Sequence, residues 1–459
     1  MLTSKGYAIR LDSFSPEKLE SLKQTLTVTP ETNADYAVAE SYKVYQTSKN
    51  FIMIPRNFGI HDHTVLRDGA PVAEGVEFSG QLKTETCQVE AVEAVVAGLR
   101  SKGSGILSLP TGYGKTTVAL YVLSKIAQKT LIVVHKEFLM TQWIERIHQF
   151  LPDARVGKIQ GTVIDVENKD IVIGMLQSLS KKEYDKNTFS DFGMTIIDET
   201  HHVCTRSFSR LFSHVNTRYL LGLSATLERK DGLTYVLHWF LGPTLFKVER
   251  KSQTQVRVDK SNFNHELFTT NPFPLNRARK PNLPEAITKI TKLPERNAHI
   301  MSLIAKAHAE NRKILVLTDR RQHCFDLLET SRDLCNYSSG LYIGGMKPEE
   351  LKESEQADVI FATYSLAHEG LDIPTLDTLI MASPKSDIVQ SVGRILRETI
   401  GKSNTPLVLD IVDMWGPFKY QFFKRCKYYK SAGFSITEST PEIELPEPAL
   451  ADVTFLEDF

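Results

Sequence analysis

The residue types best suited to phosphate chemistry lie in one short stretch, Leu109-Pro110-Thr111-Gly112-Tyr113-Gly114-Lys115-Thr116-Thr117, between an apolar run and a helical pattern. Gly112 and Gly114 allow the backbone to turn successive N–H groups toward one anion, and Lys115 and Thr116 can then reach terminal phosphates and a magnesium ion. The full P-loop pattern begins with a glycine where this chain has a leucine. A glycine-rich turn can also be purely structural, but Gly-Lys-Thr after a buried strand favours nucleotide binding.

A pair of acidic residues supplies the second part of this chemistry. Asp198-Glu199-Thr200-His201 directly follows the apolar run Met194–Ile197, so both carboxylates emerge at the carboxyl end of a strand, where open α/β sheets bind ligands. Asp198 would hold the magnesium ion together with Thr116, and Glu199 would orient and deprotonate an attacking water. Paired acids at a strand end are also common as caps, and the phosphate-binding stretch upstream favours the catalytic interpretation.

These two motifs and three later ones together resemble the superfamily 2 helicases. Ser224-Ala225-Thr226 resembles the motif that couples hydrolysis to nucleic-acid contacts, a role that the resemblance also gives to His201. Arg229-Lys230-Asp231-Gly232 resembles an extension of that motif in XPB-like members. Gln390-Ser391-Val392-Gly393-Arg394-Ile395-Leu396-Arg397 resembles the arginine-bearing motif of the second helicase domain. Its lack of a glycine before the last arginine is similar to the branch of the UvsW-type phage branch-migration helicases, with a more remote likeness to XPB-like and RecG-like members.

The resemblance implies that the second domain completes the catalytic site. Gln390 would sense the γ-phosphate or its attacking water. Arg394 and Arg397 are three residues apart, share a helix face, and could both reach a γ-phosphate held by the other domain. Such a pair is usually a solvated face, but as arginine fingers their removal would cost about 10³ to 10⁵ in turnover. Hydrolysis would need both domains closed around the ATP cleft, so ATP binding and loss would drive closing and opening.

The ATP-binding residues implied by the resemblance extend beyond the phosphate cradle. Gln88 lies where family members keep a glutamine that reads adenine, because an amide can pair with both a donor and an acceptor. The usual aromatic residue before that glutamine is Cys87 in this chain. Asp372 resembles the acid that contacts the ribose from the second domain. The expected ATP-binding residues are Gln88, Pro110, Thr111, Gly112, Tyr113, Gly114, Lys115, Thr116, Thr117 and Asp372.

Nucleic-acid contacts are expected from loops on one face of both helicase domains. Hydroxyl, amide and cationic side chains suit phosphate oxygens and bind without reading sequence, although each such residue could equally be a cap or a surface charge. The resemblance includes Trp143 in this set, whereas its spacing from Leu139 and Ile147 also fits a stripe that faces the core. The principal expected contacts are His135, Lys136, Gln177, Ser178, Thr318, Arg320, Arg321, Thr363 and Ser365.

Short apolar runs separated by helix-length segments must position these motifs. Such runs are typical of strands buried on both faces of a parallel sheet. We predict an α/β fold with two tandem RecA-like parallel-sheet domains, over residues 81–245 and 286–435, after a small α+β accessory domain over residues 1–80 that could bind DNA. Residues 246–285 are expected to form a basic connector, and residues 436–459 an acidic tail. The runs are Ile106–Leu109, Thr130–Val134, Ile171–Leu176, Met194–Ile197, Tyr219–Leu223, Ile314–Leu317, Leu341–Ile343, Val359–Phe361, Thr378–Met381 and Leu407–Ile411.

Composition and charge narrow the class of protein. The net charge of the 459 residues is zero, but the segment from Ile436 to Phe459 has seven acidic residues and no Lys or Arg, so the body carries a charge of +7. A basic body is compatible with a polyanionic partner. The five cysteines show no CxxC spacing, and no apolar run approaches the ~20 residues needed to span a bilayer. These features favour the cytoplasm, or the host cytoplasm for a phage protein.

The sequence therefore predicts an ATP-dependent and Mg²⁺-dependent DNA helicase or translocase, expected to be monomeric. Its substrates would be forked and junction DNA, which it would unwind or branch-migrate during replication and recombination. An RNA helicase and a duplex DNA translocase without strand separation are the alternatives. A non-catalytic nucleotide switch is more remote, because Lys115, Asp198, Glu199, Arg394 and Arg397 are all present.

Overall fold

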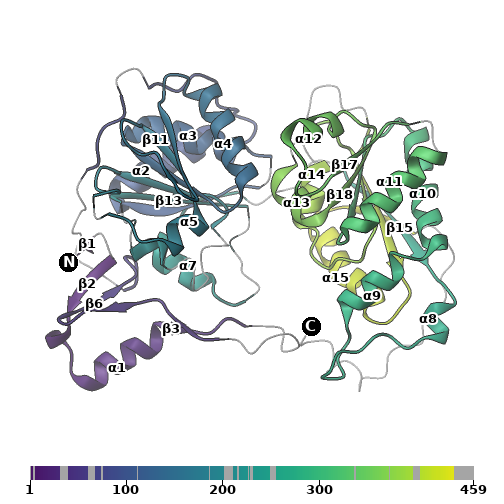
Figure 1. The fold of residues 1–459 in the computed structure, drawn as a ribbon, viewed down its shortest axis with the longest axis horizontal. Coiled ribbons are helices and arrows are strands. Elements are labelled where there is room, and N and C mark those ends of the chain that lie inside the picture. Colours follow the sequence, from purple (N-terminus) through teal and green to yellow (C-terminus); the bar gives the residue numbers. More distant parts are fainter. Residues whose placement is uncertain are drawn as a thin grey trace. The chain divides into compact units, whose positions relative to one another are not determined.

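The computed structural model describes residues 2–3, 6–31, 40–59, 68–73, 76–110, 112–185, 187–200, 210–213, 215, 217–225, 227, 231–248, 255–334, 337–371, 373–395 and 404–438. These residues form two compact units, with the boundary between Glu249 and Arg250. Each unit contains one large β-sheet with helices packed against it (Figure 1). Among the described helices, none is both long enough and apolar enough to cross a membrane.

The first unit begins with a small α+β region. Its main sheet is antiparallel, in the order β1-β2-β6-β5, and a separate pair joins β3 to β4. Helix α1 (Pro16–Thr25) has proline in its first turn, and the Ser15 hydroxyl oxygen accepts from the Lys18 N–H at 3.3 Å. The strands are β1 (Leu2–Thr3), β2 (Gly6–Arg10), β3 (Thr27–Val28), β4 (Tyr42–Lys43), β5 (Gln46–Thr47) and β6 (Phe51–Ile54).

This small region shares its hydrophobic core with the larger sheet of the first unit. Leu26 and Ile52 are fully buried in the same apolar cluster as Phe240. The Arg56 guanidinium donates to the Thr217 carbonyl at 2.8 Å, and Asn57 Nδ2 donates to the Phe240 carbonyl at 3.0 Å. The α+β region is therefore fixed to the larger sheet of the first unit by buried contacts.

The larger sheet of the first unit has the order β10-β9-β11-β8-β12-β13-β7-β14. All neighbouring strands in this sheet are parallel except β10, which is antiparallel to β9. All five apolar runs predicted in this domain are strands. The strands are β7 (Ser104–Ser108), β8 (Thr130–Val134), β9 (Val156–Gln160), β10 (Val163–Ile164), β11 (Ile171–Met175), β12 (Met194–Ile197), β13 (Tyr219–Ser224) and β14 (Thr244–Lys247).

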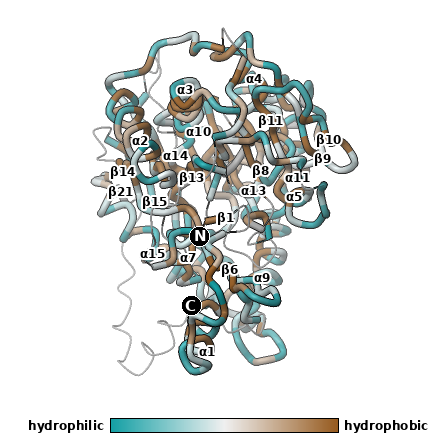
Figure 2. The backbone as a smooth tube through the Cα atoms, turned by 90° about the vertical axis from the view of Figure 1, so that its left-hand side faces the viewer, coloured by the Kyte–Doolittle hydropathy of each residue, from teal (hydrophilic) through white to brown (hydrophobic). Residues whose placement is uncertain are grey.

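Helices cover the two faces of this sheet unequally. One face packs against α2, α3 and α4, and these helices and strands supply the apolar side chains of a single buried cluster. In Figure 2, which colours the backbone by hydropathy, α3 is mainly brown, the colour of hydrophobic residues. The other face packs against α5, α7 and the small α+β region. The helices are α2 (Gln88–Lys102), α3 (Lys115–Ile126), α4 (Glu137–Phe150), α5 (Leu176–Lys181) and α7 (Thr234–Leu241).

The sheet of the second unit is entirely parallel, in the order β17-β18-β16-β19-β20-β15-β21. The five predicted runs of this domain again form strands, and helices α10 and α11 pack on one face while α13, α14 and α15 pack on the other. The strands are β15 (Arg257–Phe263), β16 (Ile314–Thr318), β17 (Ser339–Tyr342), β18 (Val359–Thr363), β19 (Thr378–Met381), β20 (Leu407–Asp413) and β21 (Ser435–Glu438). The helices are α8 (Leu267–Thr270), α9 (Leu283–Ile290), α10 (Pro294–Ala309), α11 (Arg321–Leu334), α12 (Pro348–Ser354), α13 (Tyr364–Gly370), α14 (Val389–Ile395) and α15 (Pro417–Ser431).

The structure differs from two of the expected boundaries. Arg257–Phe263, placed in the connector of residues 246–285, forms β15 inside the second sheet. It is polar in sequence, but pairing with β20 and β21 on either side satisfies its backbone groups. Strand β21 likewise includes Ile436, the first residue of the expected acidic tail, while residues 439–459 lie outside the described residues.

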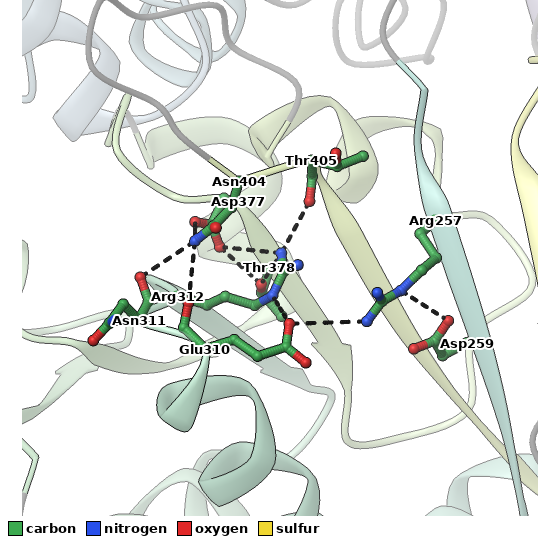
Figure 3. Close-up of polar contacts among 9 residues, drawn as sticks. All are labelled: Arg257, Asp259, Glu310, Asn311, Arg312, Asp377, Thr378, Asn404 and Thr405. Carbon is green, nitrogen blue, oxygen red and sulfur yellow. Dashed lines mark hydrogen bonds and ion pairs between the residues drawn. The ribbon is translucent and has the colours of Figure 1, made fainter.

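A polar network closes the edge of the second sheet at which its strands begin (Figure 3). Arg312, only 7% exposed, donates to Glu310 Oε2 at 2.7 Å and to the Thr405 carbonyl at 2.9 Å. Asn404 Nδ2 donates to Asp377 Oδ2 at 3.2 Å. These residues directly precede β16, β19 and β20, so the network ties together the starts of three strands. The opposite edge, where the strands end, carries the predicted motifs.

Candidate active site

The phosphate-binding stretch forms a turn between β7 and α3. Gly112 and Gly114 have φ values of 90° and 81°, in the region that favours glycine, and the Tyr113 N–H donates to the Pro110 carbonyl at 3.2 Å. Gly114 is the N-cap of α3, where no side chain caps the helix and the first turn has no acidic residue. The positive end of α3 is thus available to an anion. Thr111 lies outside the described residues.

Gln88 braces this turn from the start of α2. The residue is 4% exposed, its Oε1 accepts from the Lys83 N–H at 2.9 Å, and its Nε2 donates to the Tyr113 carbonyl at 3.1 Å. A Cβ added at Gly114 would collide with Nε2 of Gln88. The expected adenine-reading glutamine therefore holds the backbone of the cradle, beside Lys115, Thr116 and Thr117, which are half-buried.

The paired acids lie next to the cradle. Lys115 Nζ is 3.6 Å from Glu199 Oε1, which brings the two motifs together at the end of the sheet. Asp198 and Glu199 follow β12 directly, and the Glu199 N–H donates to Asp198 Oδ1 at 2.9 Å. A lysine and two carboxylates within one site suit a magnesium ion and the phosphates of a nucleotide.

Trp143 holds the second oxygen of Asp198. The Trp143 indole Nε1 donates to Asp198 Oδ2 at 2.9 Å, and the Trp143 ring is 2% exposed. Burial raises the pKa of Asp198 to about 6, and the Glu199 charge adds to the rise. The Trp143 N–H, the Lys115 charge and the Glu199 N–H oppose it, because each favours the ionised carboxylate.

The coupling motif lies between the cradle and the acids. Strand β13, which ends in Ser224, separates β7 from β12, and Ser224 pairs with Ser108. Ser224 is fully buried, and its carbonyl accepts from the Leu109 N–H at 3.2 Å, while Ala225 is half-buried. The residue before Pro110 is thus joined directly to the motif that is expected to couple hydrolysis to nucleic-acid contacts. His201 and Thr226 lie outside the described residues.

The expected nucleic-acid residues of the first unit lie on a loop and on the first turn of a neighbouring helix. Gln177 Nε2 donates to the His135 carbonyl at 2.7 Å, which joins the start of α5, directly after β11, to the loop after β8. Lys136 is half-buried, and the Ser178 hydroxyl accepts from the Gly161 N–H at 3.1 Å. Trp143, assigned to this set by resemblance, instead faces Asp198 from inside the core.

The corresponding residues of the second unit differ in their exposure. Thr318 is 1% exposed, and its hydroxyl is 3.0 Å from Nδ1 of His323. Arg320 donates to the Pro284 carbonyl at 2.6 Å and to Thr288, which ties it to α9. Thr363 is buried, whereas Arg321 and Ser365 are exposed at the ends of β16 and β18. Only the last two present their side chains directly to solvent.

The arginine motif lies on α14. Arg394 is 7% exposed, and its Nη1 donates to the Leu371 carbonyl at 2.6 Å within the same unit. One of its donors is thus engaged next to the expected ribose-binding position. The side chain of Gln390, and all of Asp372 and Arg397, lie outside the described residues.

Lys385, on the ligand edge of the second sheet, was not anticipated from the sequence, although its partners Asp319 and Tyr364 lie within the stretches expected to contact nucleic acid. Lys385 Nζ lies 3.1 Å from Asp319 Oδ1 and 5.1 Å from the centre of the Tyr364 ring. Asp319 directly follows Thr318 at the end of β16, so its acidic side chain was the available signal. The hydrogen bond from Trp143 to Asp198 could have been found in a similar way, because the N–H of a buried indole usually has a hydrogen-bond acceptor.

The fold and the site define a P-loop nucleotide hydrolase built on two RecA-like sheets. Two family models match the chain: "Type III restriction enzyme, res subunit" over residues 81–229 and "Helicase conserved C-terminal domain" over residues 295–399. A protein of Acanthamoeba polyphaga mimivirus, "Putative ATP-dependent RNA helicase L396", is 33% identical over 451 residues, which cover 95% of this chain and 86% of that protein. The chain belongs to the superfamily 2 helicases. The sequence-based identification is confirmed, and membership implies ATP hydrolysis and nucleic-acid binding.

More distant similarities extend over most of the chain. "Putative ATP-dependent RNA helicase QP509L" of African swine fever virus, isolate Tick/South Africa/Pretoriuskop Pr4/1996, is 26% identical over 392 residues, covering 78% of this chain and 74% of that protein. The structure of Saccharomyces cerevisiae Dbp5 bound to RNA and ADP BeF3 matches 76% of this chain and 89% of that chain, with 12% identity and a TM-score of 0.53. The crystal structure of T4 UvsW matches 93% and 96% of the two chains, with 18% identity and a TM-score of 0.37. The Dbp5 match confirms the helicase fold.

Proposed function

We propose that this helicase is a DNA motor that unwinds or branch-migrates forked and junction DNA in replication and recombination. The observation that carries its catalytic part is the 3.6 Å approach of Lys115 Nζ to Glu199 Oε1, beside the uncapped start of α3. A cradle for phosphates and a carboxylate for the attacking water are then adjacent. This arrangement supports turnover rather than a non-catalytic switch.

The residues of the first unit divide the catalytic work. Magnesium-bound ATP supplies the phosphoanhydride bond to be cleaved, with its charge partly neutralised. The N–H groups around Gly114 and the Lys115 cation would hold phosphate oxygens, while Thr116 and Asp198 would hold the magnesium ion. Glu199 orients and deprotonates the attacking water. Gln88 keeps the cradle in shape and reads adenine.

The second unit supplies the residues that make hydrolysis depend on domain closure. Arg394 and Arg397 stabilise charge on the transferred phosphoryl group, and Gln390 senses it. Asp372 contacts the ribose. Because Arg394 donates to the Leu371 carbonyl, it either exchanges that bond or uses its other guanidinium nitrogens for phosphate. ATP binding and release thereby become relative movement of the two domains along the nucleic acid.

The nucleic-acid track combines the loops at the ligand edges of both sheets. The first unit contributes phosphate contacts from His135, Lys136, Gln177 and Ser178. The second unit contributes the contacts that the sequence predicts for it. His201, Ser224, Ala225 and Thr226 couple hydrolysis to this track. DNA is favoured by the resemblance of the arginine motif to the XPB and UvsW branch.

RNA is the second candidate substrate, because L396 and QP509L are both named as RNA helicases. A panel of single-stranded, duplex, forked and four-way DNA, with matched RNA, tests the choice at one stated salt concentration. The proposal predicts the highest ATPase stimulation and unwinding with forked or four-way DNA. Stronger stimulation by RNA than by any DNA would reassign the substrate. ATPase stimulation by duplex DNA without strand separation would indicate a duplex translocase instead of a helicase.

A further inference from the structure

Residues 264–293, which connect β15 to α10, lie at the ligand edge of the second sheet. Strand β15 ends at Phe263, which pairs with the last residue of β20, Asp413, so the chain leaves the sheet at this edge. Helix α10 then leads back to the start of β16. In Figure 1, α8 and α9 of this segment both lie in the lower half of the second unit. The Arg320 guanidinium donates to the Pro284 carbonyl at 2.6 Å, so the segment is joined to an expected nucleic-acid residue.

A closed turn within this segment presents two arginines to solvent. The Asn276 N–H donates to the Lys280 carbonyl at 2.8 Å, and the Arg279 N–H donates to the Asn276 carbonyl at 3.0 Å. The Asn276 side-chain oxygen also accepts from the N–H groups of Ala278 and Lys280, at 2.9 and 3.0 Å. These bonds fix the backbone of the turn, while Arg277 and Arg279 are exposed at its tip.

Aromatic packing holds this turn on the second unit. The centre of the Phe273 ring lies 4.9 Å from that of Trp415 and 5.3 Å from that of Phe418. Both Trp415 and Phe418 are buried. The Asn282 N–H donates to the Pro274 carbonyl at 2.7 Å, which closes the base of the turn. The turn therefore has a fixed position at the ligand edge.

Arg279 has a backbone conformation that favours glycine. Its φ is 60°, in the left-handed region, where a side chain crowds the following carbonyl group. Glycine has no such conflict at this φ. Residues held in strained conformations are concentrated at functional sites. The presence of an arginine at this position thus favours a function for its exposed cation.

The charge around the turn favours an anionic partner. Residues 267–284 include three cations, Arg277, Arg279 and Lys280, and no acidic residue. Glu266, just before this stretch, adds one opposing charge. Three acidic residues of the neighbouring elements have cationic partners of their own, which are Lys385 for Asp319, Lys289 for Glu285 and Arg296 for Asp413. Guanidinium groups on a positive surface suit phosphate oxygens.

We propose that the turn of residues 276–280 extends the nucleic-acid track of the second unit, with Arg277 and Arg279 bound to backbone phosphates. This inference rests on the proposed helicase function and adds two contacts to its track. Arg320 donates to α9 within the protein, so it positions the segment, and the exposed arginines of the turn supply the charge. Contacts of this kind bind nucleic acid without reading its sequence.

The test measures binding of a fluorescently labelled thymidine oligonucleotide by anisotropy, between about 50 and 200 mM salt. The double variant Arg277→Gln, Arg279→Gly removes both cations, and glycine adopts the φ of this position without strain. We expect its affinity to fall roughly tenfold at the lowest salt concentration. The slope of log affinity against log salt should become shallower by about 1.4, because each phosphate contact to a single strand contributes ~0.7. Its melting temperature should stay close to that of wild type.

Two single variants serve as matched controls. Arg279→Lys keeps both the φ and the positive charge, so it should keep the salt slope of wild type. Arg332→Gln removes an exposed arginine from the last turn of α11, away from the ligand edge, and should also behave like wild type.

Four results would overturn the role of the turn. Unchanged affinity and salt slope in the double variant would remove the turn from the track, with the helicase function intact. An equal loss in Arg332→Gln would show a general effect of net charge. Tighter binding by the double variant would assign the turn to the acidic segment after Ile436, as a competitor of nucleic acid. Absence of nucleic-acid binding by wild type would overturn the proposed function as well.

Discussion

The indole of Trp143 donates a hydrogen bond to the Asp198 carboxylate at 2.9 Å, from a helix that begins directly after the expected nucleic-acid residue Lys136. One rigid helix thereby connects a loop of the track to the expected magnesium ligand. Because the Trp143 ring is buried, water cannot reach its N–H and take the place of the Asp198 carboxylate as hydrogen-bond acceptor. The hydrogen bond from Trp143 influences the pKa of Asp198, so we expect ATP hydrolysis to depend on pH. Helix α4 also connects the expected magnesium ligand to the expected nucleic-acid loop.

Trp143→Phe should shift the acid limb of the ATPase. The pKa of Asp198 is raised to about 6, so magnesium binding weakens as pH falls below about 6 and the carboxylate takes up a proton. Removing the N–H favours the protonated form further, so the midpoint should move upward by about one pH unit and the apparent Mg²⁺ affinity should fall. The measurement is ATPase against Mg²⁺ concentration from pH 5.5 to 8. Trp239→Phe, a half-buried tryptophan on α7, is the control; the same midpoint in both variants would contradict the role of Trp143.

Gly114→Ala should abolish nucleotide binding without unfolding the protein. The added Cβ collides with Gln88 Nε2. Alanine would also have to adopt the φ of 81° at this position, and that backbone strain alone costs about 1 kcal/mol. Gly433→Ala has a similar φ of 72° with no atom within 4 Å of the added Cβ, so it separates strain from collision. Titration with a fluorescent ATP analogue provides the readout. Equal binding by the two variants would show that the contact between Gln88 and the cradle is unimportant.

Arg394→Lys should lower nucleic-acid-stimulated turnover by about 10³ while retaining ATP binding. Lysine keeps the charge but lacks the planar fork that can bind a phosphoryl group and the Leu371 carbonyl together. Single-turnover ATPase and analogue binding separate the two effects. Arg332→Lys, an exposed residue on α11, is the matched control. Wild-type turnover in Arg394→Lys would remove Arg394 from the catalytic set.

Arg312→Ala should destabilise the second unit by about 1 to 3 kcal/mol, because it removes a buried guanidinium that lies beside the buried side chains of Asp377 and Thr378. Nucleotide affinity of the first unit should be unchanged. Urea unfolding followed by circular dichroism, with analogue binding in parallel, measures both. Lys313→Ala removes a more exposed ion pair, in which Lys313 Nζ lies 3.1 Å from Asp358 Oδ1, and it should lower the free energy of unfolding by less. An equal loss in the two variants would contradict the structural role of the network.

The apolar runs predicted ten of the sheet strands because strands buried on both faces need continuous apolar sequence. The other five strands of the two large sheets, β9, β10, β14, β15 and β21, escaped that criterion. For example, Arg257–Phe263 is mainly polar, and Val163–Ile164 is a short edge strand. Motif spacing predicted that Lys115 and Glu199 would meet. It could not predict that His323, five residues further along the chain, would engage Thr318, because that contact depends on how α11 leaves the end of β16. It could not predict that Arg320 would bond to α9, because that contact depends on the packing of a helix 32 residues upstream.

Nucleic-acid-stimulated ATPase of Glu199→Gln and Lys115→Ala tests the central claim most directly, with Glu167→Gln, an exposed glutamate of the same unit, as control. Turnover should be abolished in the first two variants and unchanged in the third, while DNA binding stays largely intact in all three. Unchanged turnover in either Glu199→Gln or Lys115→Ala would contradict the assignment of the ATP site.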